Sequence, residues 1–225
     1  MTDQHDVRIS ARSIAKYQKH AAGYDQTSGP TWPIRMRTID ALDLRPGDHV
    51  LDVGCGTGLS LPLLVQAVGP SGKVSGFDHS PAMLAQARAR CAQANWPNVQ
   101  LALSSAQDLA LPGPVDALLF HYAHDILRSP SAIDRLLTLA RPGARVAIAG
   151  IKYFPGLLSL LNPWVYLKNQ GYNGAPGELH APWDRIAPRL TDWRLTPTQW
   201  GMGYIASGRL LSVAWQGSTA GTARS

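Results

Sequence analysis

The chain has 225 residues, of which 45% are hydrophobic and 16% charged, with a formal net charge of +6. This length and composition fit one α/β domain with a substantial core. We expect a cytoplasmic protein, because no stretch is long and apolar enough to span a membrane, the N-terminus has no signal core and the two cysteines lack metal-ligand spacing. The basic excess would suit nucleic acid or a membrane surface, but its scattered arginines favour a simple compositional bias.

Residues 1–45 are predicted to form a helical segment on the substrate side of the domain. Residues 7–22 have helical periodicity, with the basic residues Arg8, Arg12, Lys16 and Lys19 on one face. A solvated surface helix is the simplest interpretation, and a lid over the site or a helix on anionic lipid are the alternatives. A second helix is expected over residues 33–42, with Pro33 at its first position.

Strands and helices alternate from residue 48 to 150. Strands are predicted at 50–53, 73–78, 99–103, 116–120 and 145–149, and helices at 59–68, 81–94 and after Ser129-Pro130. Arg141-Pro142-Gly143 is expected to be a turn. Such alternation predicts a doubly wound, Rossmann-like, mostly parallel sheet whose strands all end at one ligand-binding edge.

The last third of the chain has a different pattern. A helix is expected over residues 155–168, interrupted by Asn162-Pro163, and a Gly/Pro-rich loop follows over 171–182. Strands at 193–200 and 204–210 form a predicted hairpin, and residues 217–225 a disordered tail. The domain proper is therefore expected to span residues 46–216.

A glycine-rich turn follows the first strand of the alternating region. Gly54, Gly56 and Gly58 stand on alternate positions, so the chain can turn sharply and bring its backbone against a ligand. The third glycine comes one position too early for a dinucleotide motif. Asp52 would repel a pyrophosphate but attract a cation. Asp78, at the end of the next strand, suits the two hydroxyls of a ribose.

These features, together with the run Ala140 to Val146, resemble the class I S-adenosylmethionine-dependent methyltransferases. The resemblance covers roughly residues 10–150 and implies a seven-stranded sheet closed by an antiparallel hairpin. It also implies that S-adenosyl-L-methionine is the cofactor. The cofactor-binding residues that it implies are Asp52, Gly54, Cys55, Gly56, Gly58, Asp78, His79, Met83, Ser105, Ala106, Gln107 and His121, with Tyr17 and Tyr24 closing over the cofactor. The family usually has Gly-Asp-Ala where this chain has Ser104-Ser105-Ala106, so Ser105, Gln107 or Asp108 replaces the usual acid.

The segment after the fourth strand holds the candidate catalytic residues. His121, His124 and Asp125 could supply a general base and the group that orients it. In the alternative interpretation, His121 only lines the cofactor pocket and His124-Asp125 begins a helix. The run Phe120 to Ala123 is not the Asn/Asp-Pro-Pro-aromatic run of enzymes that methylate nucleic-acid bases, so no nucleic-acid partner is expected.

The methyl acceptor is expected to be a small apolar or aromatic metabolite, methylated on O or N. Aromatic and leucine side chains between Tyr153 and Leu167 would form its apolar wall, unless they are ordinary core residues. A phospholipid or quinone-like lipid, reached through peripheral membrane contact, is the alternative acceptor. A non-enzymatic cofactor-binding module and a dinucleotide oxidoreductase are more distant alternatives, and the oligomeric state is left open.

Overall fold

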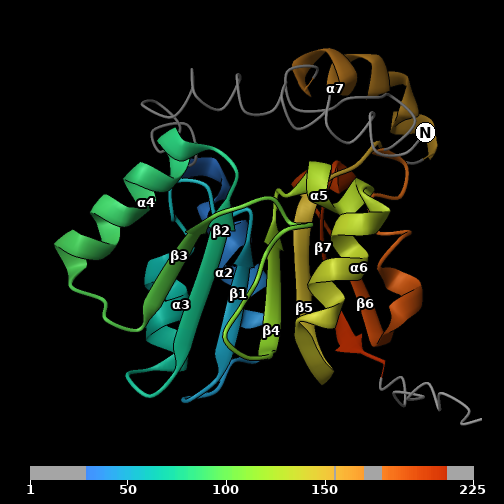
Figure 1. The fold of residues 1–225 in the computed structure, drawn as a ribbon. Helices are drawn as coiled ribbons and strands as arrows, with labels where there is room; N and C mark the ends of the chain where they lie inside the picture. Colours follow the sequence, from blue (N-terminus) through green and yellow to red (C-terminus); the bar gives the residue numbers. More distant parts are fainter. Residues whose placement is uncertain (1–28, 155, 170–178, 212–225) are drawn as a thin grey trace, which may run out of the picture.

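A seven-stranded sheet forms the centre of the protein, in the order β3-β2-β1-β4-β5-β7-β6 (Figure 1). The computed structural model describes residues 29–154, 156–169 and 179–211. The strands are β1 (His49–Val53), β2 (Lys73–Asp78), β3 (Val99–Leu103), β4 (Val115–His121), β5 (Ala140–Ile151), β6 (Leu190–Thr198) and β7 (Gly203–Leu210). The first five are parallel, and β7 runs antiparallel to both β5 and β6. The predicted doubly wound sheet with its closing hairpin is confirmed.

Two layers of helices bury the two faces of this sheet (Figure 1). The helices are α2 (Trp32–Asp40), α3 (Leu61–Val68), α4 (Pro81–Ala94), α5 (His124–Arg128), α6 (Pro130–Thr138) and α7 (Asn162–Asn169), with 3-10 turns η1 (Gly29–Thr31), η2 (Gly156–Leu161), η4 (Ala187–Arg189) and η5 (Gln199–Gly201). Side chains of α2, α3 and α4 pack on Val50 and Leu119, whereas those of α5 and α6 pack on Leu51 and Phe120. Alternate residues of a strand thus enter opposite layers.

Most predicted boundaries hold to within three residues, and three predicted features differ in kind or starting point. The helix expected from residue 59 begins at Leu61, because the glycine turn continues to Ser60. The turn expected at residues 141–143 is an irregularity inside β5, where the register with β4 shifts and Gly143 has φ +76°. Asn162-Pro163 does not interrupt a helix: α7 begins there, after η2.

Some predictions concern segments outside the described residues. These are the N-terminal helix at 7–22 with its basic face, most of the Gly/Pro-rich loop and the tail from residue 217. Within the described part of the chain, no helix is both long and apolar enough to cross a membrane.

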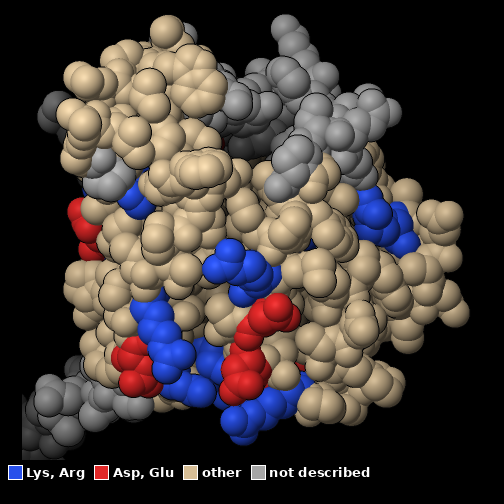
Figure 2. All heavy atoms as spheres, turned by 180° about the vertical axis from the view of Figure 1, so that it is seen from behind, with Lys and Arg blue, Asp and Glu red and all other residues tan. Residues whose placement is uncertain are grey.

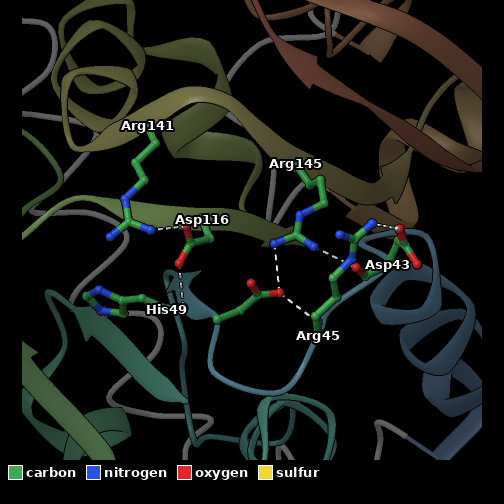
Figure 3. Close-up of polar contacts among 7 residues, drawn as sticks. Asp43, Arg45, His49, Asp116, Arg141 and Arg145 are labelled. Carbon is green, nitrogen blue, oxygen red and sulfur yellow. Dashed lines mark hydrogen bonds and ion pairs between the residues drawn. The ribbon is translucent and has the colours of Figure 1, made fainter. Parts of the chain in front are cut away.

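A charged network closes the amino ends of the strands, opposite to the edge that carries the glycine turn (Figure 3). Arg145 donates from Nη2 to Asp48 Oδ2 at 2.7 Å and from Nη1 to the Asp43 carbonyl at 2.6 Å. Asp116 accepts from the His49 backbone at 2.8 Å and pairs with Arg141. These bonds join β1, β4, β5 and the loop before β1.

Basic and acidic groups lie next to each other on this part of the surface, so the network is charge-balanced rather than a basic patch (Figure 2).

Candidate active site

A pocket opens at the carboxyl ends of β1, β2 and β4, at the edge where ligands bind in doubly wound sheets. Its lining residues are Gly54, Gly56, Asp78, His79, Met83, His121, Tyr122, Ala123, His124, Asp125 and Ile126. The pocket therefore brings together six of the predicted cofactor-binding residues and all three candidate catalytic residues. Tyr122, Ala123 and Ile126 were not among the predicted site residues.

The three glycines of the turn have different physical roles. All have positive φ: +65° at Gly54, +55° at Gly56 and +81° at Gly58. A Cβ at Gly58 would lie 2.7 Å from Leu61 Cδ1 and 3.2 Å from Ala87 Cα, so this glycine lets α3 and α4 approach the turn. A Cβ at Gly56 would meet nothing within 4 Å. Gly56 therefore leaves open space, which suits a bound ligand.

Asp78 holds the glycine turn in place at the end of β2. Its carboxylate accepts from the Gly56 N–H at 2.9 Å and from the Ser80 N–H at 2.8 Å. Burial raises the pKa of Asp78, and these backbone donors oppose that rise. The predicted Ser80 cap forms at the start of α4, where the hydroxyl accepts from the Met83 N–H at 3.5 Å. The acid and the turn thus form one connected unit.

Asp52 is a buried acid with an unsatisfied oxygen. Its Oδ2 has no hydrogen-bond partner among the described residues. Burial raises the pKa of Asp52 to about 7, with Arg35 lowering it and Asp78 raising it. A buried carboxylate with spare acceptor capacity and a pKa this high favours a cationic ligand, which would stabilise its ionised form.

Arg35 is the cation beside this acid, and sequence reasoning missed it. It lies on the buried face of α2 with Ile34 and Thr38, and its Nη1 donates to Ser60 Oγ at 2.5 Å. Arginine is seldom buried without a charged or polar partner. The signal available in the sequence was therefore an arginine at a buried position of an amphipathic helix.

His121 and Tyr122 line the pocket at the end of β4. Burial, and next the nearby Arg35, hold the pKa of His121 well below its ordinary value. Its Nε2 has no hydrogen-bond partner within the described ranges. The ring of Tyr122 stands edge-on to that of His121 at 4.9 Å between centroids, and Tyr122 has φ +59°. The left-handed backbone at a bulky residue is a strained conformation, of the kind that collects at functional sites.

His124 begins α5 and is buried, as the helix-start interpretation expects. Its Nε2 accepts from the Ile151 N–H at 3.3 Å, so the ring is neutral with its proton on Nδ1. Burial, followed by repulsion from Arg128, lowers the pKa of His124 to about 4. Gly150 makes room for the ring, because a Cβ there would lie 2.5 Å from His124 Cε1.

Asp125 does not orient His124 in this structure. Its carboxylate pairs with Arg128 at 2.5 Å, three residues along α5. The Nδ1 atom of His124 is buried, with no hydrogen-bond partner in the described part of the chain. If His124 acts as a base, it would therefore do so as a neutral, buried imidazole whose Nδ1 has no hydrogen bond to a carboxylate.

The other predicted cofactor residues that the structure describes are not among those that line the pocket. Ser105 donates to Asp108 at 2.7 Å, and Gln107 donates to Ser129 at 3.2 Å. Ala106 is buried in the core. Cys55 is buried too, and burial raises the pKa of its thiol. Tyr17 and Tyr24 lie outside the described residues.

The expected apolar wall divides into two parts. Tyr153 and Val165 are buried, in a cluster against which Tyr122 packs. The other large apolar residues of η2 and α7 are at least 48% exposed: Leu157, Leu158, Leu160, Leu161, Trp164 and Leu167. These residues are therefore neither core nor pocket lining.

Known proteins resemble this chain in the segment that contains the residues lining the pocket. A family model described as a methyltransferase domain matches residues 50–143. Nocamycin O-methyltransferase of Saccharothrix syringae is 31% identical over 60% of this chain and 49% of its own length. Demethylmenaquinone methyltransferase of Symbiobacterium thermophilum is 36% identical over 45% of this chain and 41% of its own length. The chain thus spans about half or less of these curated relatives.

A solved structure extends the likeness to the whole fold. The N-methyltransferase NodS of Bradyrhizobium japonicum, in complex with S-adenosyl-L-homocysteine, has a TM-score of 0.65 at 14% identity. The match covers 88% of this chain and 98% of NodS. With the strand order, the glycine turn and its two acids, these findings support the resemblance of this chain to the class I S-adenosylmethionine-dependent methyltransferases.

Proposed function

We propose that the protein transfers a methyl group from S-adenosyl-L-methionine to O or N of a small apolar or aromatic metabolite. The observation that carries this proposal is the pair of buried acids at the glycine turn. Asp52 has an oxygen free to meet a cation, and Asp78 joins the turn to the pocket. In a ligand that combines a cationic amino-acid end with a ribose, Asp52 would face the positive charge and Asp78 the ribose hydroxyls.

The charges around the turn fit the amino-acid end of this cofactor. Its ammonium group is matched by Asp52, and its carboxylate by the buried cation of Arg35. The open position at Gly56 leaves space for the ligand beside the turn, and Asp78 would accept from the ribose hydroxyls. His79 and Met83 line the same pocket and would flank the adenine. Ser105, Ala106 and Gln107 stay proposals for the adenine end, with Tyr17 and Tyr24 for closure.

S-adenosyl-L-methionine supplies a methyl group bound to a positively charged sulfur, ready for in-line displacement. The protein's task is then to hold the acceptor in line and to exclude water. Tyr122, Ala123 and Ile126 give the pocket an apolar side that suits an aromatic or apolar acceptor. Two relatives are named as methyltransferases of nocamycin and of aklanonic acid, which supports a small-molecule acceptor.

An acceptor that arrives protonated needs a base, and we assign that role to His124 or His121. Burial lowers the pKa of both rings, so both are neutral at pH 7. The Nε2 of His121 has no hydrogen-bond partner among the described residues, whereas the Nε2 of His124 would first have to release the Ile151 N–H before it could accept a proton. Asp125 pairs with Arg128 and acts on the imidazole of His124 through its charge, which raises the pKa of His124 against the larger effects of burial and Arg128.

The decisive experiment combines a binding and a transfer measurement. The protein is incubated with methyl-labelled S-adenosylmethionine and a metabolite extract, and the labelled product is identified. In parallel, calorimetry compares the wild type with Asp78→Ala, which should lose cofactor binding. Unchanged affinity in the variant would refute the cofactor assignment. Cofactor binding without transfer to any acceptor would instead favour a binding module.

A lipid acceptor is the second candidate, and one observation favours it. Six large apolar side chains on η2 and α7 are exposed near the pocket. The relatives include a demethylmenaquinone methyltransferase, whose acceptor is named as a quinone. A lipid fraction added to the labelling experiment separates this candidate from a water-soluble acceptor.

A further inference from the structure

The exposed apolar side chains of η2 and α7 form one projecting surface. We define the α7 ridge as these residues: Leu157, Leu158, Leu160, Leu161, Trp164 and Leu167. Leu157 and Leu160 at its tip are 87% and 79% exposed. Figure 1 shows α7 beyond the carboxyl ends of the strands, and the face of the upper-left projection that Figure 2 displays shows no charged atoms. An apolar surface this exposed marks an interaction site.

The charge pattern of this stretch matches an anionic surface. Residues 153–167 contain no charged residue, and the stretch is bracketed in the sequence by Lys152 and Lys168. No Asp or Glu occurs between Asp134 and Glu178. In the sequence, an uncharged apolar stretch that lies between two lysines and far from any acid has a composition that favours both insertion among acyl chains and attraction to anionic headgroups. In the structure, Lys152 Nζ donates to the Tyr153 carbonyl at 3.4 Å.

Asn162, at the start of α7, forms its side-chain hydrogen bonds within the protein. Asn162 Oδ1 accepts from the Phe154 N–H at 2.8 Å, and its Nδ2 donates to the Phe154 carbonyl at 3.2 Å. A protein partner would need hydrogen-bonding groups at its interface, whereas a bilayer requires that such groups be bonded within the protein. Asn162 meets the second requirement.

A second aromatic side chain lies at the same edge of the sheet. Trp200 in η5 is 94% exposed, and β7 next to it pairs Gly203 with Ile151. Met202 packs against the cluster that contains Val165 of α7. Trp164 and Trp200 are thus close in sequence to Val165 and Met202, which belong to or pack against the same cluster. Tryptophan is a side chain that prefers the headgroup region of a bilayer.

The ridge is connected to the pocket through one side chain. The buried side of α7 packs Val165 with Tyr153, and Tyr122 packs against both while lining the pocket. We propose that the α7 ridge inserts into the headgroup region of an anionic lipid bilayer, so that the pocket works beside the lipid surface. This docking does not depend on which acceptor is methylated, nor on cofactor binding.

Vesicle flotation of the full chain tests this inference. Wild-type protein should float with vesicles of phosphatidylcholine mixed with phosphatidylglycerol and much less with phosphatidylcholine alone. The double variant Leu157→Asp/Leu160→Asp should bind the mixed vesicles at least about tenfold more weakly, because two inserted side chains become charged. The matched control is Met36→Asp/Leu195→Asp, which removes two exposed apolar residues outside the ridge and should float like the wild type.

Two further measurements make the outcome decisive. Circular dichroism and cofactor titration of both variants should match the wild type, which separates this inference from the proposed transfer activity. Flotation of the ridge variant at wild-type level, or no flotation of the wild type, overturns the proposal. So does a wild-type dimer in light scattering that the ridge variant converts to a monomer, since the ridge would then be a protein interface.

Discussion

Replacing Asp52 with Asn should remove a specific pH dependence of cofactor binding. Burial places the pKa of Asp52 near 7, and a cationic cofactor binds the ionised form. The carboxyl is about 90% ionised at pH 8 and about 9% at pH 6. The dissociation constant of the cofactor should therefore rise roughly tenfold as the pH falls from 8 to 6. The Asp52→Asn variant should bind the cofactor more weakly than the wild type at pH 8, and its dissociation constant should not show this tenfold change.

Isothermal titration calorimetry of both proteins from pH 5.5 to 8.5 measures this difference. Titration of the cofactor itself is the same in both series, so the ratio of the two dissociation constants isolates Asp52. Wild-type binding at pH 7 should also release about half a proton, visible as a heat that depends on the buffer. Parallel profiles for wild type and variant would refute the assignment of Asp52 as the cation's partner.

The raised pKa of Asp52 also predicts how the stability of the cofactor-free protein depends on pH. Because its folded-state pKa lies above the ordinary 3.8, Asp52 contributes stability that is full below about pH 4 and lost as the pH rises through 7. Ionising it in the fold costs roughly 4 kcal/mol more than in the unfolded chain. Asp52→Asn should therefore unfold at a higher temperature than the wild type at pH 8, with a smaller difference at pH 5. An equal difference at both pH values would contradict this reasoning.

Three further predictions concern the turn, the buried cation and the opposite edge. Gly58→Ala should lower the free energy of unfolding in urea by about 3 kcal/mol, because its Cβ meets a leucine 2.7 Å away at positive φ. Gly56→Ala, with open space around the new Cβ, should cost only about 1 kcal/mol while weakening cofactor binding; equal losses of stability would contradict the packing argument. Arg35→Met should move the midpoint of the Asp52 pH profile above 7, because the arginine now lowers that pKa; calorimetry over the same pH series measures it, and an unmoved midpoint counts against the pairing. Arg145→Met should cost roughly 2 kcal/mol in urea unfolding and leave cofactor affinity unchanged; a large loss of affinity would contradict the separation of the two edges.

The parts of the fold with strong local signals were predictable from the sequence. β2, α4 and β3 have the expected boundaries, because Ser80-Pro81 caps and starts α4 and Gly69 to Gly72 forms a turn before β2. The glycine turn with its two acids likewise follows from adjacent residues. Caps and turns of this kind are determined by residues within a few positions of one another, so they can be recognised from the sequence alone.

The features that sequence reasoning missed depend on distant partners. Arg35 is a site residue only because α2 packs beside the turn, where Ser60 accepts its hydrogen bond 25 positions away. Arg141-Pro142-Gly143 has the composition of a turn, yet Ala140 before it pairs with Val115 and Arg145 after it pairs with Ala117 and Arg209, so the segment becomes an irregularity inside β5. The η2 and α7 leucines have the composition of a pocket wall, and only the tertiary arrangement turns them outwards.

The imidazole of His124 occupies the volume that a side chain at residue 150 would fill. Neither position can therefore change freely alone: a methyl group at 150 meets the ring, and a smaller residue at 124 leaves a void in the sheet's edge. A larger residue at 150 becomes tolerable only once the histidine has been replaced by something small. The two sites, 26 positions apart, should for this reason exchange as a pair among descendants of this sequence, provided that the hydroxyl of Tyr204, which a Cβ at residue 150 would meet at 3.1 Å, also shifts.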